Sequence, residues 1–131
     1  RLAMQAVYQW QMTAQDAADI LAQFLADEDN RGADNEYFEA LVRGVVQGHA
    51  QLDALLAPTL ARPLHEVDPV ERAVLRMAAY ELKQRPDVPY RVVLNEAVAL
   101  AKKFGAEQGH TFVNAALDKL ARELRALEMR G

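Results

Sequence analysis

The 131-residue sequence contains no cysteine and no serine. Without cysteine the chain forms neither disulfides nor thiolate-bound zinc sites, which fits a reducing cytoplasm. The commonest nucleophiles of covalent catalysis are also missing, and the only alcohol hydroxyls besides those of tyrosine belong to Thr13, Thr59 and Thr111. We therefore do not expect covalent hydrolase chemistry.

Other signs of catalysis are absent as well. The histidines His49, His65 and His110 lie far apart in the sequence, without a metal-binding spacing such as HExxH. No glycine cluster matches a phosphate-binding loop or a dinucleotide fingerprint. Acidic pairs such as Asp27 and Asp29 are better explained as solvated charge than as an acid and base pair. The sequence predicts a non-enzymatic protein with no metal and no cofactor.

Charge and hydropathy bound the class of protein further. No apolar run is long enough to span a bilayer, and the net charge is −4. Residues 1–65 hold 4 basic and 9 acidic side chains, whereas residues 66–131 hold 11 basic and 10 acidic ones. This charge distribution lacks the basic stripe of a general nucleic-acid binder. Charge alone therefore favours the interpretation that both halves present ordinary solvated helix faces. The length and the 51% hydrophobic content predict one globular domain over residues 1–131.

Apolar residues recur at a spacing of three or four along almost the whole chain, and no sustained alternation bounded by turn residues is present. The predicted fold class is therefore all-α. We expect a bundle of about seven helices in two sequence halves, joined by short connectors and a polar loop at 27–32. The clearest helical segments are 2–13, 16–26, 34–58, 69–85, 90–104 and 110–128.

Two helix boundaries carry specific signals. Asp68 can cap a helix whose first residue is Pro69 and whose third is Glu71, an arrangement similar to a capping box. Gly105 follows the segment 90–104 directly and is expected to close that helix in a left-handed conformation. Both boundaries frame the second half of the bundle.

Gly44 and Gly48 lie inside the long helix expected at 34–58. Their spacing of four residues puts them on one face, where the missing side chains can let another helix approach closely. His49 falls on the apolar stripe of the same helix, so we expect it to be a hydrogen-bonded packing residue and not a ligand or base.

Three separated segments together resemble one family. They are AMQAVYQWQ at 3–11, VERAVLRMAAYEL at 70–82 and VPYRVVLNEAVALAKKFGAEQGHTFVNAALDKLA at 88–121. In this order and at these spacings they are similar to the NusB family of antitermination factors over nearly the whole chain. A similar helical domain is also found at the N-terminus of a family of RNA cytosine methyltransferases. We favour the stand-alone factor, because no cofactor-binding domain follows residue 131.

The resemblance implies a bacterial, cytoplasmic, non-catalytic protein that pairs with NusE, a ribosomal small-subunit protein. The pair binds the boxA element of nascent RNA, notably in ribosomal RNA operons, and acts on RNA polymerase indirectly through the antitermination complex. An RNA-independent protein-interaction module or a self-associating bundle remains the alternative. The sequence leaves open whether the chain is a monomer or a homodimer.

The resemblance also implies an RNA surface on the first helix and on the turn between the last two helices. In single-stranded RNA, aromatic rings can stack on bases, amides can read base edges and lysines can neutralise phosphates. Phe104 and Phe112 can instead plug a helix junction, and Tyr8 can bury its ring. Lys102 can simply complement a helix dipole. The RNA-binding residues implied are Arg1, Gln5, Tyr8, Lys102, Phe104, Gln108, His110 and Phe112.

For the NusE surface, the resemblance implies Glu71, Arg72 and Arg76 on the helix that begins near residue 69. Capping of that helix is the competing role for Glu71. The sequence departs from the family in two ways. The basic segment that precedes the first helix in other members is expected to be missing, together with the native N-terminus. Gln108 stands where better-known members have an acidic residue, and an amide there should favour RNA because it does not repel phosphate.

Overall fold

The computed structural model describes residues 1–27 and 35–130. Within them all regular secondary structure is helical, which confirms the predicted all-α class. The polar loop expected at 27–32 falls largely outside the described residues. No described helix is long and apolar enough to cross a membrane. The α-helices are α1 (Leu2–Thr13), α2 (Ala17–Ala26), α3 (Asn35–Leu56), α4 (Pro69–Gln84), α5 (Tyr90–Phe104), α6 (Gly109–Leu124) and α7 (Ala126–Arg130), and short 3₁₀ helices lie at Ala57–Thr59 and Leu64–Glu66.

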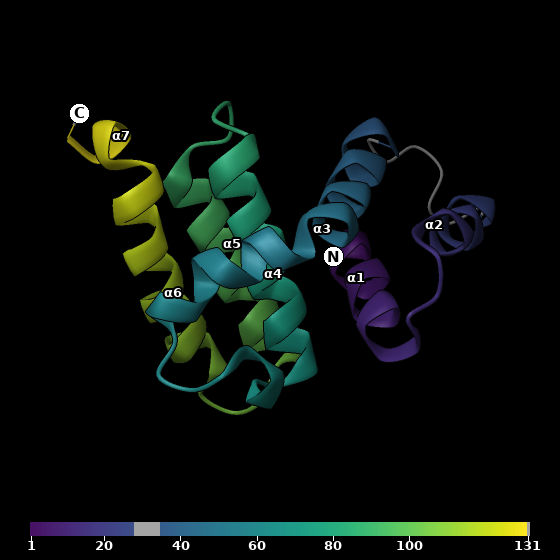
Figure 1. The fold of residues 1–131 in the computed structure, drawn as a ribbon, viewed down its shortest axis with the longest axis horizontal. Coiled ribbons are helices and arrows are strands. Elements are labelled where there is room, and N and C mark those ends of the chain that lie inside the picture. Colours follow the sequence, from purple (N-terminus) through teal and green to yellow (C-terminus); the bar gives the residue numbers. More distant parts are fainter. Residues whose placement is uncertain (28–34, 131) are drawn as a thin grey trace.

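The helices form two groups, as predicted. In Figure 1, α1 and α2 lie on one side and α4 to α7 on the other, while α3 extends between them. The contacts agree, because α3 packs against α1 and α2 and also against α4 and α6. α4 is the central helix of the second group and touches α1, α3, α5 and α6. A continuous hydrophobic core joins the two groups, with fully buried side chains that include Ile20, Leu21, Leu56, Leu75, Leu117 and Leu120.

The predicted start of α4 is confirmed in part. The Asp68 carboxylate accepts hydrogen bonds from the backbone N–H groups of Val70 and Glu71, at 3.1 and 3.3 Å. Pro69 is the first helical residue, where its missing N–H costs nothing. The return bond of a capping box is not made, because the Glu71 carboxylate accepts the N–H of Ala106 instead. Asp68 alone therefore caps α4.

The predicted left-handed cap at Gly105 is wrong. Gly105 is extended, with φ −86° and ψ −176°, and the left-handed residue of this turn is Gln108, with φ 66°. Glycine is needed at position 105 because there is no room for a Cβ atom, and not because the backbone is left-handed there. A Cβ atom there would lie 2.7 Å from the carbonyl oxygen of Ala101 and 3.2 Å from Glu71 Oε2.

The two glycines of α3 differ in their surroundings. A Cβ atom on Gly44 would lie 2.2 Å from Cε2 of Tyr80 on α4, whereas one on Gly48 would meet nothing within 4 Å. The expectation of close approach is confirmed for Gly44 and wrong for Gly48, because only Gly44 faces a side chain of α4. His49, one residue further, is exposed: its Nδ1 lies 2.8 Å from the carbonyl oxygen of Val46, and its ring packs on Trp10. It is hydrogen-bonded as expected, but it lies outside the core.

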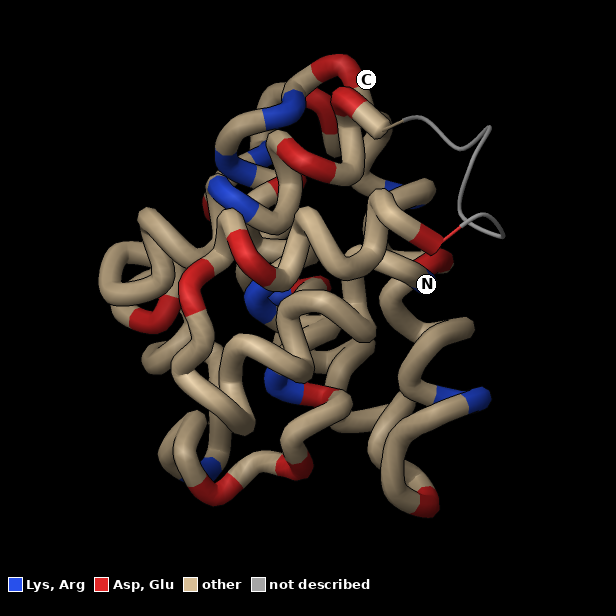
Figure 2. The backbone as a smooth tube through the Cα atoms, turned by 90° about the vertical axis from the view of Figure 1, so that its right-hand side faces the viewer, with Lys and Arg blue, Asp and Glu red and all other residues tan. Residues whose placement is uncertain are grey.

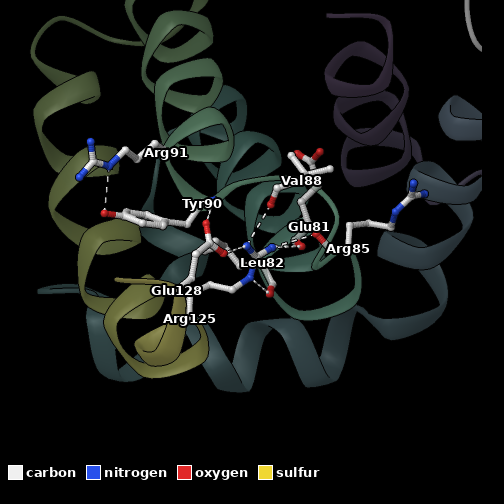
Figure 3. Close-up of polar contacts among 8 residues, drawn as sticks. All are labelled: Glu81, Leu82, Arg85, Val88, Tyr90, Arg91, Arg125 and Glu128. Carbon is white, nitrogen blue, oxygen red and sulfur yellow. Dashed lines mark hydrogen bonds and ion pairs between the residues drawn. The ribbon is translucent and has the colours of Figure 1, made fainter. Parts of the chain in front are cut away.

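The last predicted helix, 110–128, is interrupted at Arg125. α6 ends at Leu124, Arg125 has φ −124° and ψ 33°, and α7 begins at Ala126. Periodicity alone does not show this break, because the Arg125 side chain turns inward and is buried. Figure 3 shows its guanidinium at the centre of a set of hydrogen bonds. Its acceptors are the backbone carbonyls of Glu81, Leu82, Arg85 and Val88 and the carboxylate of Glu128.

Candidate nucleic-acid interface and partner face

The N-terminus of α1 and the C-terminus of α5 meet at the ring of Phe104. The guanidinium carbon of Arg1 lies 5.0 Å from the ring centre and Nζ of Lys103 lies 5.5 Å from it. Phe104 is half-buried and packs against the core, as expected if its ring fills the junction between two helices. The two segments assigned to RNA are 100 residues or so apart in sequence, yet this contact joins them into one neighbourhood. Cations near an aromatic face are common in proteins and by themselves do not mark a ligand site, but a ring and cations at one place can stack a base and contact a phosphate.

α1 presents an exposed row that begins at this contact. Arg1, Gln5 and Tyr8 follow one another at spacings of four and three, so they share one face of the helix. All three are exposed, and the Tyr8 side chain remains 37% accessible. The alternative that Tyr8 lies in the core is therefore not what the structure shows.

The turn between α5 and α6 consists of residues 105–108. Lys102 and Gln108 are exposed at its two ends, and His110 is half-buried in the first turn of α6. Phe112 is half-buried against the core, and the guanidinium carbon of Arg62 lies 4.7 Å from its ring centre. Sequence reasoning missed Arg62, because nothing in the spacing connects residue 62 with residue 112.

Beneath this turn lies the carboxylate of Glu71. The residue is 1% exposed, and Oε2 accepts the backbone N–H of Ala106 at 2.9 Å. Gly105 and Gly109 flank the carboxylate so closely that a Cβ atom on Gly109 would lie 2.2 Å from Oε2. Such burial disagrees with a direct contact between Glu71 and a partner, because the third residue of α4 points inward under the turn.

Arg76 is held by an interhelical network. Its guanidinium donates twice to the carboxylate of Asp53 on α3, at 2.9 Å each, and once to Oε1 of Gln11 on α1 at 3.0 Å. It also lies 5.4 Å from the ring centre of Trp10. Its side chain is only 13% exposed. Arg76 therefore joins α1, α3 and α4, and little of its surface remains for a partner.

Arg72 is the freer of the two arginines predicted on α4. Its Nη1 donates to the carbonyl oxygen of His65 at 3.3 Å, and its buried Nε has no hydrogen-bond partner among the described atoms. Both arginines face a cleft of about 650 Å³ between α1, α3, α4 and the 57–66 connector. The residues that line it are Trp10, Gln11, Ala14, His49, Asp53, Ala57, Pro63, Leu64, His65, Arg72 and Arg76.

The charges around these surfaces are mixed. In Figure 2, Lys and Arg positions lie among Asp and Glu positions on the described part of the chain. No group of three or more His, Asp or Glu side chains within residues 1–27 and 35–130 could hold a metal ion. The described residues around these surfaces therefore present a few placed cations, rings and amides among mixed charges.

A buried acidic group lies on the opposite side of α4. Tyr37 of α3 donates a hydrogen bond to the Glu81 carboxylate, which borders an apolar pocket of about 360 Å³ between α1, α3, α4 and α5. Burial raises the pKa of Glu81 above its ordinary value, although the bond from Tyr37 opposes the shift. Burial and the same bond raise the pKa of the Tyr37 hydroxyl. The pKa values of both members of this pair are therefore raised.

This shift predicts how stability depends on pH. A carboxyl whose folded pKa exceeds its unfolded pKa stabilises the fold at low pH, and this contribution is lost as the pH rises through the folded pKa. Glu81→Gln removes the titration and keeps an acceptor for Tyr37. The free energy of unfolding of the variant, minus that of the wild type, should therefore increase from about pH 4 to about pH 8.

Urea unfolding at several pH values measures that difference. The control is Glu123→Gln, which changes an exposed glutamate on α6. A difference that stays constant or decreases as the pH rises would show that Glu81 does not titrate as its burial indicates.

Comparison with known families gives a match over most of the chain. The model of the NusB family matches residues 1–122. The transcription antitermination protein NusB of Nitrosococcus oceani is 55% identical over 128 residues, covering 98% of this chain and 86% of that protein. The protein of the same name from Shewanella halifaxensis is 55% identical over 120 residues, covering 92% and 89%.

Solved structures agree with the fold. A structure of T. maritima NusB superposes with a TM-score of 0.88 at 29% identity, covering 99% of this chain and 93% of that one. NusB in a complex of the antitermination factors NusB and NusE with double-stranded RNA gives a TM-score of 0.85. At 23% identity, with 93% and 92% of the two chains covered, the second match supports the fold alone.

Proposed function

The chain belongs to the NusB family, and we propose on that basis that it is a transcription antitermination factor that pairs with NusE and binds boxA RNA. The observation that carries the proposal is 55% identity with a NusB protein over 98% of the chain. As a member of this family it catalyses no reaction. Because its targets are nascent transcripts, its place of action is the bacterial cytoplasm. The antitermination names of the relatives favour this role over that of a methyltransferase domain.

The RNA surface that we propose follows the residues implied by the resemblance. Arg1, Gln5 and Tyr8 are exposed along α1, and Arg1 connects this row to Phe104 at the α5–α6 turn. Lys102 and Gln108 lie exposed at the edges of that turn. Stacking on Tyr8, base-edge contacts from Gln5 and Gln108, and phosphate contacts from Arg1 and Lys102 suit single-stranded RNA. His110 and the edges of Phe104 and Phe112 complete the surface.

The partner face that we propose is α4 with the cleft beside it. Arg72 and Arg76 line this cleft, and the Arg72 side chain makes one hydrogen bond among the described residues, from Nη1 to the carbonyl oxygen of His65. Glu71 is buried on the same helix, so it would support this face without touching NusE. The part of α1 that lines the cleft is Trp10, Gln11 and Ala14, so NusE bound there would leave Arg1, Gln5 and Tyr8 free for RNA and could add contacts of its own.

A titration tests the pairing and the RNA preference together. We expect boxA RNA to bind more tightly than a scrambled sequence by about tenfold in the presence of NusE, roughly the effect of one or two lost base contacts. Lys102→Gln should weaken binding of both RNAs by a few-fold, because it removes a phosphate contact. Fluorescence anisotropy with labelled RNA measures these affinities.

The matched control is Lys119→Gln. It removes an exposed lysine that lies about 15 Å along α6 from the α5–α6 turn. Equal affinity for boxA and scrambled RNA in the presence of NusE would reject the specific RNA function. It would leave the RNA-independent interaction module as the explanation. Equal effects of the two lysine variants would show that RNA does not approach the α5–α6 turn.

A further inference from the structure

A carboxylate is enclosed between two helix ends that belong to the same surface. Glu71 Oε2 accepts the N–H of Ala106 at 2.9 Å, and the residue is 1% exposed. A Cβ atom on Gly109 would lie 2.2 Å from Oε2 and 2.4 Å from the carboxyl carbon. A Cβ atom on Gly105 would lie 3.2 Å from the same oxygen. The space for this carboxylate depends on glycine at position 109, and a Cβ atom at position 105 would crowd it.

Capping of α4 does not explain this arrangement. Asp68 already accepts the N–H groups of Val70 and Glu71, so the start of α4 is capped without the Glu71 carboxylate. The bond that Glu71 makes crosses to a different segment, 35 residues further along the chain. Its negative charge also lies beside Gly109, the first residue of α6, where the partial positive charge of the helix N-terminus favours it.

The turn that Glu71 holds has little other support. Its backbone is closed by the bonds from Gly105 N–H to Ala101 and from Gly109 N–H to Ala106. The side chains of Ala106, Glu107 and Gln108 are all exposed and add no packing. Gln108 is moreover held at φ 66°, which side-chain-bearing residues rarely adopt. An internal acceptor is therefore what keeps Ala106, and with it the following residues, in one conformation.

We propose that Glu71 is a positioning residue for RNA: its buried carboxylate fixes the 105–109 turn so that Gln108 and His110 are presented beside Lys102 in a binding conformation. This inference rests on the proposed RNA function and replaces a direct partner contact by Glu71. The benefit is preorganisation, because a turn that is ordered before binding loses less conformational entropy when RNA binds.

Three substitutions separate the parts of this role. Glu71→Gln keeps an acceptor of the same length and removes the charge. Glu71→Asp keeps the charge but is one methylene too short to reach Ala106. Glu71→Met removes both. We expect boxA affinity, measured with NusE present, to stay within a few-fold of the wild type in Glu71→Gln and to fall about tenfold in the other two.

The readout specific to positioning is amide hydrogen exchange of Ala106, followed by NMR. We expect its protection to be kept in Glu71→Gln and lost in Glu71→Asp and Glu71→Met, while amides in the middle of α4 and α6 remain protected. Affinities are expressed per folded molecule, with the folded fraction taken from circular dichroism. A loss of stability alone then leaves the corrected affinity unchanged.

Four outcomes decide the question. The pattern above supports the proposal. Loss of Ala106 protection with unchanged boxA affinity overturns it and leaves the RNA function intact. An equal loss of affinity in Glu71→Gln overturns it as well, because the hydrogen bond would then not be the determinant. A wild-type protein with no preference for boxA overturns the proposed function, and this inference with it.

Discussion

Arg125→Met is expected to lower the free energy of unfolding by about 3 kcal/mol, because hydrogen bonds from a charged group are each worth about 1.5–3 kcal/mol and their loss is only partly offset by water. The four carbonyls that Arg125 binds lie at 2.8–3.0 Å from its nitrogens. Three of them belong to the end of α4 and its C-cap, where helix carbonyls run out of helical partners. The carbonyls of Glu81 and Arg85 also accept the backbone N–H groups of Arg85 and Val88, so the loss falls mainly on those of Leu82 and Val88. Methionine fills similar space and satisfies none of them.

Removing Arg125 should also loosen the C-terminus. The Glu128 carboxylate bonds to Arg125 at 2.6 Å through Oε1 and to the backbone N–H of Tyr90 at 2.7 Å through Oε2 (Figure 3). α7 is therefore tied both to α6 and to the start of α5. Without Arg125, α7 should lose its amide protection before the rest of the bundle unfolds.

Urea denaturation and thermal melts followed by circular dichroism measure the effect, and the melting temperature should fall by roughly 10 °C. Arg125→Lys is expected to be intermediate, because an ammonium has three donors and cannot reach carbonyls on several sides at once. Arg122→Met is the matched control on the same helix: its bond to Asp118 is exposed and is worth about 0.5 kcal/mol or less. Similar losses in Arg122→Met and Arg125→Met would contradict the role assigned to the buried guanidinium.

The features that sequence predicted well are local ones. The limits of α1, α2 and α5 follow from apolar spacing within single segments, and the cap of α4 follows from Asp68 and Pro69 being neighbours. Arg125 could not be predicted in the same way. Its carbonyl acceptors lie 37 to 44 residues earlier in the chain, and a charged residue among leucines has no local mark that distinguishes an inward from an outward side chain.

The candidate site shows the same division. Family resemblance placed Gln5, Tyr8 and Gln108 on a surface, and the structure exposes all three. Resemblance said nothing of how the surface is assembled. The contact of Arg1 with Phe104 and the bond between Glu71 and Ala106 each join segments that only the packing of α4 brings together.

Gly44→Ala should destabilise the protein, and Gly48→Ala should stabilise it. Alanine in place of glycine inside a helix is favourable by about 1 kcal/mol when the added methyl group meets nothing. Gly48 is such a position. At Gly44 the methyl group would lie 2.2 Å from the ring of Tyr80, and overpacking of this kind costs about 1–3 kcal/mol. Urea denaturation should therefore separate the two variants by about 2 kcal/mol, with opposite signs relative to the wild type.

Tyr80 supplies the test of the cause. In a Tyr80→Ala background the ring is gone, so Gly44→Ala should become as favourable as Gly48→Ala already is in the wild type. The double-mutant cycle then gives a coupling energy between positions 44 and 80, of the same size as the overpacking cost, whereas positions 48 and 80 should show none. If Gly44→Ala remains destabilising without the ring, the close approach of α3 and α4 depends on backbone contact and not on Tyr80. If Gly44→Ala instead becomes favourable without the ring, a four-residue glycine spacing marks a helix crossing only where the facing helix supplies a side chain to fill it.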